Sequence, residues 1–202
     1  MATLKMDGQR RMKQFVGSCF VVLGLSACGG SVPTTTPSLS NGAVPLVNPS
    51  FDLTPDGSLA GWEANEHSRG KSFSFTADAS NMVSAPASAR INRYGDEAWG
   101  LLRQTLPVKT VWIGKTARLS GSLKSEGADS FGAGLLLQTR TSGEDVLTYN
   151  HMSDRRLMGT QAWAKYSVEI KIPPQAFQFN LGIILEGGGT LWADDIQLEI
   201  ID

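Results

Sequence analysis

Few side chains in this chain of 202 residues could carry out catalysis. The chain has two histidines, His67 and His151, and it lacks the Gly-x-Ser-x-Gly turn that presents a nucleophilic serine in many hydrolases. A retaining glycosidase needs two carboxyl groups about 5 Å apart, but the acidic pairs Glu144-Asp145 and Asp194-Asp195 are adjacent residues that point to opposite faces of a strand. A Ser-His-Asp triad is assembled in space, so the sequence leaves that arrangement open. We expect a protein that is not an enzyme.

Both cysteines, Cys19 and Cys28, lie near the N-terminus. A basic start, the apolar residues 15–25 and the small residues before Cys28 are typical of a secretory signal peptide. The apolar run has about half of the ~20 residues that a membrane span needs. Leu25-Ser26-Ala27-Cys28 resembles the lipobox of bacterial lipoproteins, which implies that Cys28 is lipidated and becomes the mature N-terminus. By the same resemblance, Gly29 directly after Cys28 favours the outer membrane over the inner membrane. The alternative to a lipobox is an ordinary secretory signal in which Cys28 occurs by chance.

These features divide the chain into a signal peptide (1–27), a lipidated cysteine with a flexible tether (28–43) and a folded domain (44–202). Met12 is a second candidate start beside Met1. The tether is small, polar and proline-containing, so it cannot bury enough apolar area to offset its loss of conformational entropy. The formal net charge of the whole chain is −1, and no Lys/Arg cluster of the kind that binds nucleic acid is present in the domain.

Apolar and polar residues alternate with a period of two from residue 72 onward. This alternation is typical of half-buried strands, and Gly, Pro, Asn and Asp mark the turns between them. The expected strands are residues 72–78, 89–93, 100–107, 117–124, 132–140, 146–152, 164–172, 177–185 and 189–200. About ten short strands without helical periodicity predict an antiparallel β-sandwich of two sheets, which we identify as a jelly roll.

Three segments of the domain carry a resemblance to a known family. Val47-Asn48-Pro49-Ser50-Phe51-Asp52 with Gly61-Trp62 resembles the opening of carbohydrate-binding modules of families four and nine. The end of the chain, residues 188–199, is similar to the closing strand of the same galactose-binding-like jelly roll. Residues 159–166, with Asn150-His151-Met152 and Arg155, resemble a subgroup attached to bacterial transcription regulators and hydrolases. The resemblance implies a non-catalytic module that binds a glycan or a similar polar ligand.

The resemblance also implies a structural Ca²⁺ that joins the first strand to the last. Calcium takes six to eight oxygen ligands, and Asn48, Asp52, Asp194 and Asp195 supply such oxygens, with Asp56 nearby. Asp52 stands where the family usually has the longer Glu. The alternative is that Asp56 begins a Pro-Asp-Gly turn and that Asp194-Asp195 form a bulge in the last strand.

Sugar binding in such modules uses aromatic rings that stack on pyranose rings, together with polar side chains that hydrogen-bond the hydroxyls. The candidates are Trp99, Arg103, Gln138, Arg140, Tyr149 and His151. By the period of two, Gln138 shares a face with Arg140, and Tyr149 shares a face with His151. The alternative is that the aromatic residues pack at the sheet margin.

We therefore expect a lipoprotein anchored in the cell envelope whose single jelly roll binds a carbohydrate. The rival function is a structural module that holds a protein partner in an envelope complex. A sensing role borrowed from the regulator subgroup is a third option, although this chain carries no output domain after the jelly roll. An aromatic cluster beside polar residues favours sugar, whereas a flat apolar patch favours a protein.

Overall fold

The computed structural model describes residues 42–52, 54, 58–67 and 71–202. The predicted signal peptide, Cys28 and Asp56 lie outside these residues. The described part of the chain contains ten strands and one short 3₁₀ turn, Thr110–Trp112, and all the strand pairings are antiparallel. The all-β, antiparallel jelly roll predicted from the sequence is confirmed. In this part of the chain no helix is long and apolar enough to cross a membrane.

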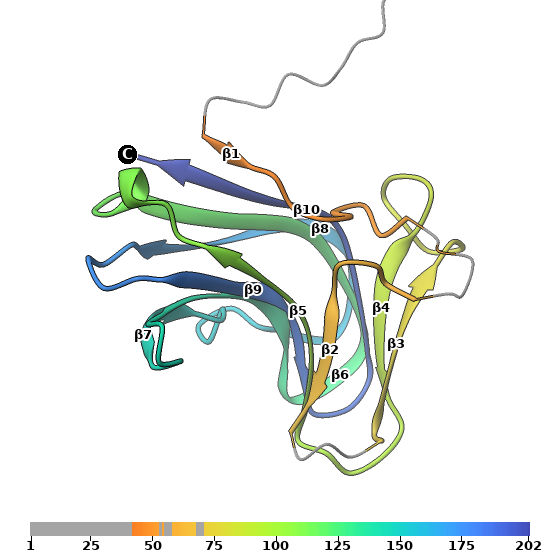
Figure 1. Cartoon of the computed structure of the whole chain (residues 1–202). Helices are drawn as coiled ribbons and strands as arrows, with labels where there is room; N and C mark the ends of the chain where they lie inside the picture. Colours follow the sequence, from red (N-terminus) through yellow and green to blue (C-terminus); the bar gives the residue numbers. More distant parts are fainter. Residues whose placement is uncertain (1–41, 53, 55–57, 68–70) are drawn as a thin grey trace, which may run out of the picture. The chain divides into compact units, whose positions relative to one another are not determined.

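The strands are β1 (Ala43–Val44), β2 (Glu63–Glu66), β3 (Phe73–Asp78), β4 (Ser88–Arg93), β5 (Trp99–Pro107), β6 (Thr116–Arg140), β7 (Val146–Asn150), β8 (Leu157–Lys171), β9 (Gln178–Glu186) and β10 (Thr190–Ile201). They form two layers, which Figure 1 shows one above the other. The β10 sheet has the order β8-β6-β10-β4-β3, and β1 pairs with the far end of β10. The β9 sheet has the order β2-β5-β9-β6-β7.

β6 belongs to both sheets, a feature that differs from the prediction. Residues 117–124 and 132–140 are predicted as two strands, but they are the two halves of one strand of 25 residues. The first half pairs with β10 and β8, and the second half pairs with β9 and β7. Gly127, Ser130 and Gly132 have positive φ values where the strand bends from one layer into the other. The glycines and polar residues of this bend read as a turn in the sequence, whereas the backbone continues as a kinked strand.

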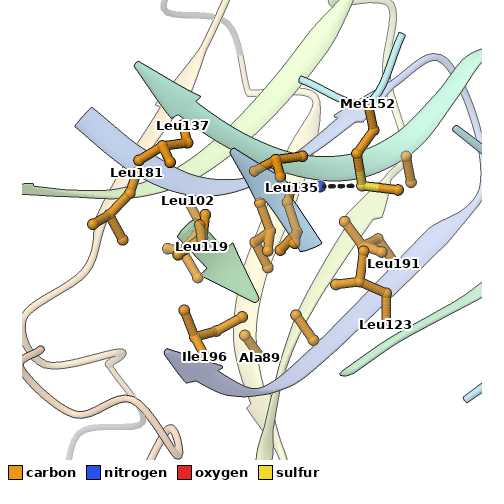
Figure 2. Packing of buried hydrophobic residues seen from close by; sticks show 14 of the residues in the cluster. Ala89, Leu102, Leu119, Leu123, Leu135, Leu137, Met152, Leu181, Leu191 and Ile196 are labelled. Atoms are coloured by element: carbon orange, nitrogen blue, oxygen red, sulfur yellow. Dashed lines mark hydrogen bonds between the residues drawn. The ribbon is translucent and has the colours of Figure 1, made fainter. Parts of the chain in front are cut away.

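The two sheets enclose one apolar core. In β9 the alternate residues Phe179, Leu181, Ile183 and Leu185 are fully buried and point inward. They meet side chains from the β10 sheet such as Leu119, Leu123 and Leu191, as Figure 2 shows for part of the cluster. Each such aliphatic side chain contributes about 1.5–3 kcal/mol of transfer free energy when it is fully buried. The core therefore fixes which residues of β5, β6, β7 and β9 must point outward.

Two short strands, β1 and β2, are absent from the sequence-based prediction. β2 reads Glu-Ala-Asn-Glu and has no apolar alternation, because it lies at the edge of its sheet and pairs only with β5. β1 has two residues and begins at Ala43, one residue before the predicted start of the domain. Such short edge strands carry little periodic signal.

Candidate functional site

The outward surface of the β9 sheet, which we call the β9 face, holds all six residues predicted to contact a ligand. Trp99 and Arg103 alternate in β5 with the inward-pointing Leu102. In the neighbouring strands Gln138 lies directly opposite Tyr149. The strand register thus brings residues that are up to 50 positions apart in sequence, Trp99 and Tyr149, onto one surface. Because a strand rises about 3.3 Å per residue, Trp99 and Arg103 are roughly 13 Å apart along it.

The middle of the β9 face is apolar. Leu101 of β5 and Ile184 of β9 lie directly opposite each other and are only 7% and 5% exposed, yet neither belongs to the core cluster. Their neighbours on the same face include glycines, Gly182 beside Arg103 and Gly134 beside Ile184. Met152 and Arg156 lie against the outward side of Gly134, so this apolar centre is covered, and polar and aromatic side chains surround it.

A buried ion pair borders this centre, and the sequence analysis did not predict it. The Arg156 guanidinium lies 2.8 Å from a carboxylate oxygen of Glu186, and its side chain is only 7% exposed. The same nitrogen of Arg156, Nη2, also lies 3.1 Å from Nδ1 of His151. Burial lowers the pKa of Arg156, whereas the charge and hydrogen bond of Glu186 oppose that shift. Nη1 of Arg156 is buried and has no hydrogen-bond partner in the described part of the chain.

The neighbouring Arg155, which the family resemblance singled out, lies at the surface instead. It pairs with Asp154 at 3.0 Å and donates to the Ser167 carbonyl. Residues 151–156 form a turn rather than a strand, so no periodic pattern tells which of two adjacent arginines points inward. The one available signal was the Arg-Arg doublet itself.

The two predicted arginines of the β9 face are each held by a carboxylate. Arg103 donates two hydrogen bonds to Glu63 of β2, at 3.0 and 3.2 Å. These hydrogen bonds, more than the charge of Arg103 alone, place the pKa of Glu63 below its usual range. Arg140 pairs with Glu144 at 2.8 Å, and Gln178 donates to the other oxygen of Glu144. Both arginines are therefore oriented before any ligand binds.

Aromatic side chains lie on both margins of the β9 face. Tyr149 in β7 is 64% exposed, and its ring meets His151 edge-on at 5.4 Å. Trp99 in β5 is half-buried and meets His67 edge-on at 5.9 Å. The strands β9 and β6 lie between them, which at about 4.8 Å per strand step puts the two margins roughly 14 Å apart. The structure thus places Trp99 and Tyr149 on one face but not in one cluster.

The segments predicted to hold calcium lie next to each other. The turn that contains Asn48 and Asp52 meets the bulge of β10, where the Ile196 N–H donates to the Pro49 carbonyl at 3.3 Å. Within that turn, Oδ1 of Asn48 accepts the Asp52 N–H at 2.6 Å. Asp194 and Asp195 occupy the bulge, as the alternative interpretation of the sequence had it.

The carboxylate of Asp194 is engaged within the protein. One oxygen accepts the backbone N–H groups of Val83 and Ser84, both at 2.8 Å. The other oxygen accepts the Asp195 N–H and the Ser84 hydroxyl. Among the described residues no three His, Cys, Asp or Glu side chains converge as a metal site. Because these donors occupy both of its oxygens, Asp194 does not fit the role of a calcium ligand in this arrangement. Calcium binding stays a prediction.

Comparison with known proteins supports the fold. No family model matches the chain. An uncharacterised HTH-type transcriptional regulator, YbfP, of Bacillus subtilis (strain 168) is 32% identical over 91 residues, which are 45% of this chain and 30% of that protein. The chain therefore spans less than a third of the length of this relative.

Among solved structures, the CBM22-1 xylan-binding domain from Paenibacillus barcinonensis Xyn10C has a TM-score of 0.53 at 16% identity, covering 76% of this chain and 92% of that domain. TmCBM61 in complex with β-1,4-galactotriose has a TM-score of 0.50 at 16% identity, covering 77% and 97%. The enzymatically active domain of tailspike protein 4 from bacteriophage CBA120 has a TM-score of 0.57 at 12% identity, but only 21% of that chain is covered. The fold is thus that of non-catalytic carbohydrate-binding modules, and it also occurs as part of enzymes.

Proposed function

We propose that the protein binds a glycan non-catalytically on the β9 face. The observation that carries the proposal is the convergence of Trp99, Arg103, Gln138, Arg140, Tyr149 and His151 on that one surface, around an apolar centre. The modules of the same fold that are described as binding xylan or β-1,4-galactotriose support the ligand class. The ligand class that we propose is therefore a neutral oligosaccharide.

The chemistry of the face suits a sugar. Tyr149 offers an exposed ring that can stack on the apolar side of a pyranose. Gln138 lies directly opposite Tyr149, and its side-chain amide can donate a hydrogen bond to a sugar hydroxyl and accept one from another. Arg103 is already oriented by Glu63, so little rotamer entropy is lost when a ligand binds.

A glycan array with the purified protein tests this proposal, with xylan and β-1,4-galactan oligosaccharides among the probes. The proposal expects binding to at least one glycan that Tyr149→Ala weakens. Tyr94→Ala is the matched control, since Tyr94 is 63% exposed but lies in the loop after β4. Absence of glycan binding, together with a specific envelope protein that crosslinks to the β9 face, would favour the rival function of a protein-interaction module.

We further propose that Cys28 anchors the protein in the cell envelope, on the outer membrane. The support is the sequence alone: the lipobox-like Leu25-Ser26-Ala27-Cys28 and the Gly29 that follows it. Metabolic labelling with an alkyne fatty acid tests the anchor. Cys28→Ser is expected to abolish the label and Cys19→Ser to retain it. Equal labelling of both variants would contradict the proposal.

A further inference from the structure

The opposite layer of the sandwich carries a second arrangement of polar and aromatic side chains. On the outward surface of the β10 sheet, Arg90, Trp192 and Lys124 lie opposite one another on β4, β10 and β6. The Arg90 guanidinium lies 5.7 Å from the centre of the Trp192 ring, and the Lys124 ammonium lies 5.1 Å from it. Trp192 is only 5% exposed, because the two cations cover its faces.

An open depression of about 520 Å³ adjoins this row. It is lined by residues of β3, the edge strand of the β10 sheet, and of the segment that follows it, together with Arg90 of β4; Figure 1 shows β3 and β4 side by side. Thr76, Asp78, Ser80 and Arg90 contribute the polar part of its lining. The volume is within the usual range for small-molecule sites. None of the residues predicted from the sequence to bind a ligand lines it.

Asp78 is fully engaged within the protein. One carboxylate oxygen accepts the backbone N–H and the hydroxyl of Ser80, at 2.9 and 2.6 Å. The other oxygen accepts the indole N–H of Trp192 at 2.9 Å. Burial raises the pKa of Asp78, but the hydrogen bonds from Ser80 and Trp192 outweigh it and leave the pKa below its usual range. Asp78 is thus a fixed negative charge whose two oxygens both accept hydrogen bonds within the protein.

Arg90 is not engaged in the same way. In the described part of the chain its guanidinium forms no ion pair within 4 Å, and its Nε is buried without a hydrogen-bond partner. Lys124, by contrast, donates to Oδ1 of Asn81 at 3.0 Å. The positive charge of Arg90 contributes to the lowered pKa of Asp78, although the hydrogen bonds to that carboxylate come from Ser80 and Trp192. A buried N–H without an acceptor is unfavourable.

We propose that this depression is a second ligand site, in which Arg90 binds an oxyanion such as the carboxylate of an acidic sugar or a phosphate. Because Nε of Arg90 is buried, the donors that can reach a ligand in the depression are the terminal Nη groups of the guanidinium, which can bond the oxygens of a carboxylate or phosphate. Trp192 offers the Arg90 guanidinium a cation–π contact, 5.7 Å from the ring centre. The hydroxyls of Thr76 and Ser80 line the space that the remainder of the ligand occupies.

The test follows the indole N–H signal of Trp192 by NMR while the purified protein is titrated with galacturonate, inorganic phosphate or galactose. That N–H bonds to Asp78 at the depression, so it reports on the site directly. We expect a saturable shift with galacturonate or phosphate and no comparable shift with galactose. The tighter of the two anions identifies the source of the oxyanion. No shift with either anion, or an equal shift with galactose, would overturn the proposal without any variant.

Variants then assign the effect to Arg90. Arg90→Gln is expected to weaken binding of the anion at least about tenfold, while Arg118→Gln, which removes the same charge from the same sheet, leaves it unchanged. Equal weakening by both variants would show a general effect of charge and overturn the site. Tyr149→Ala is expected to have no effect, so this site can succeed or fail independently of glycan binding on the β9 face.

Discussion

At the scale of single residues, Arg156 is the side chain on which the β9 face depends most. Its guanidinium is buried and is compensated by Glu186 at 2.8 Å and by the ring of His151. Removing one partner of a buried pair leaves the other charge without compensation, which is costlier than losing an exposed pair. We infer that Arg156 positions His151 and, through it, the exposed ring of Tyr149.

Replacing Arg156 by Gln is expected to lower the free energy of unfolding by about 3 kcal/mol, because Glu186 loses its buried counter-charge. Arg155→Gln is the control, since Arg155 pairs with Asp154 at the surface and the loss is expected to stay below about 1 kcal/mol. Urea unfolding of the two variants and the wild type measures the difference. Equal losses would contradict the burial argument.

The pair of Glu63 and Arg103 predicts a dependence on pH. The pKa of Glu63 is lowered from 4.5 in the folded protein, chiefly by the hydrogen bond from Arg103. The pair therefore stabilises the fold above the ordinary carboxyl pKa, and this contribution is lost as the pH falls through the lower, folded-state pKa. Because the pair is partly exposed, the effect is below about 1 kcal/mol. The difference in melting temperature between the wild type and Glu63→Gln is expected to shrink from pH 6 to pH 3, and a constant difference would argue against it.

At the scale of elements, the kinked strand β6 holds the two layers together. Its halves pair with β8 and β10 in one sheet and with β7 and β9 in the other. The apolar alternation of residues 117–124 and 132–140 was enough to predict both halves. Their continuity was not predictable, because residues 125–131 have the composition of a loop and the choice between loop and kinked strand is made by the neighbouring strands.

Gly132 is the position in β6 where a side chain is expected to cost most. Its φ is +74°, and an added Cβ would lie 2.5 Å from the Leu157 carbonyl oxygen. Gly127, with φ +60° and nothing within 4 Å of such a Cβ, is the matched control. Gly127→Ala is expected to cost about 1 kcal/mol for the backbone conformation alone, and Gly132→Ala about 1–3 kcal/mol more. Thermal or urea unfolding measures both, and similar losses would show that the close contact does not matter.

The calcium prediction concerns the contact between the turn at Asn48–Asp52 and the bulge of β10. If Ca²⁺ binds there, it joins the two ends of the domain and stabilises the folded state by mass action. The calcium prediction requires the melting temperature to rise with millimolar Ca²⁺ and to fall with a chelator, and Asp195→Asn to remove the response, whereas the hydrogen bonds that already occupy Asp194 oppose it. A melting temperature that is indifferent to both additions would end the calcium prediction.

At the scale of the whole molecule, two-residue periodicity was sufficient to predict the fold class and that Gln138 shares a face with Arg140. Gln138 points outward because its neighbour Leu137 fills the core, and the strand register places Tyr149 and Trp99 on the same side. The ion pair of Arg156 and Glu186 was not predictable, since it joins a turn to the end of β9 and depends on tertiary contacts. The open depression beside Arg90 likewise depends on the order of β3, β4 and β10.

The central claim is that the β9 face binds a glycan, and calorimetric titration of one glycan into three proteins tests it most directly. We predict that Tyr149→Ala binds a glycan selected on the array at least about tenfold more weakly than the wild type, because an exposed stacking ring is lost. Tyr94→Ala, whose ring is exposed to the same extent elsewhere, is predicted to bind as the wild type does. Equal affinity of all three proteins, or a loss with Tyr94→Ala alone, would contradict the claim.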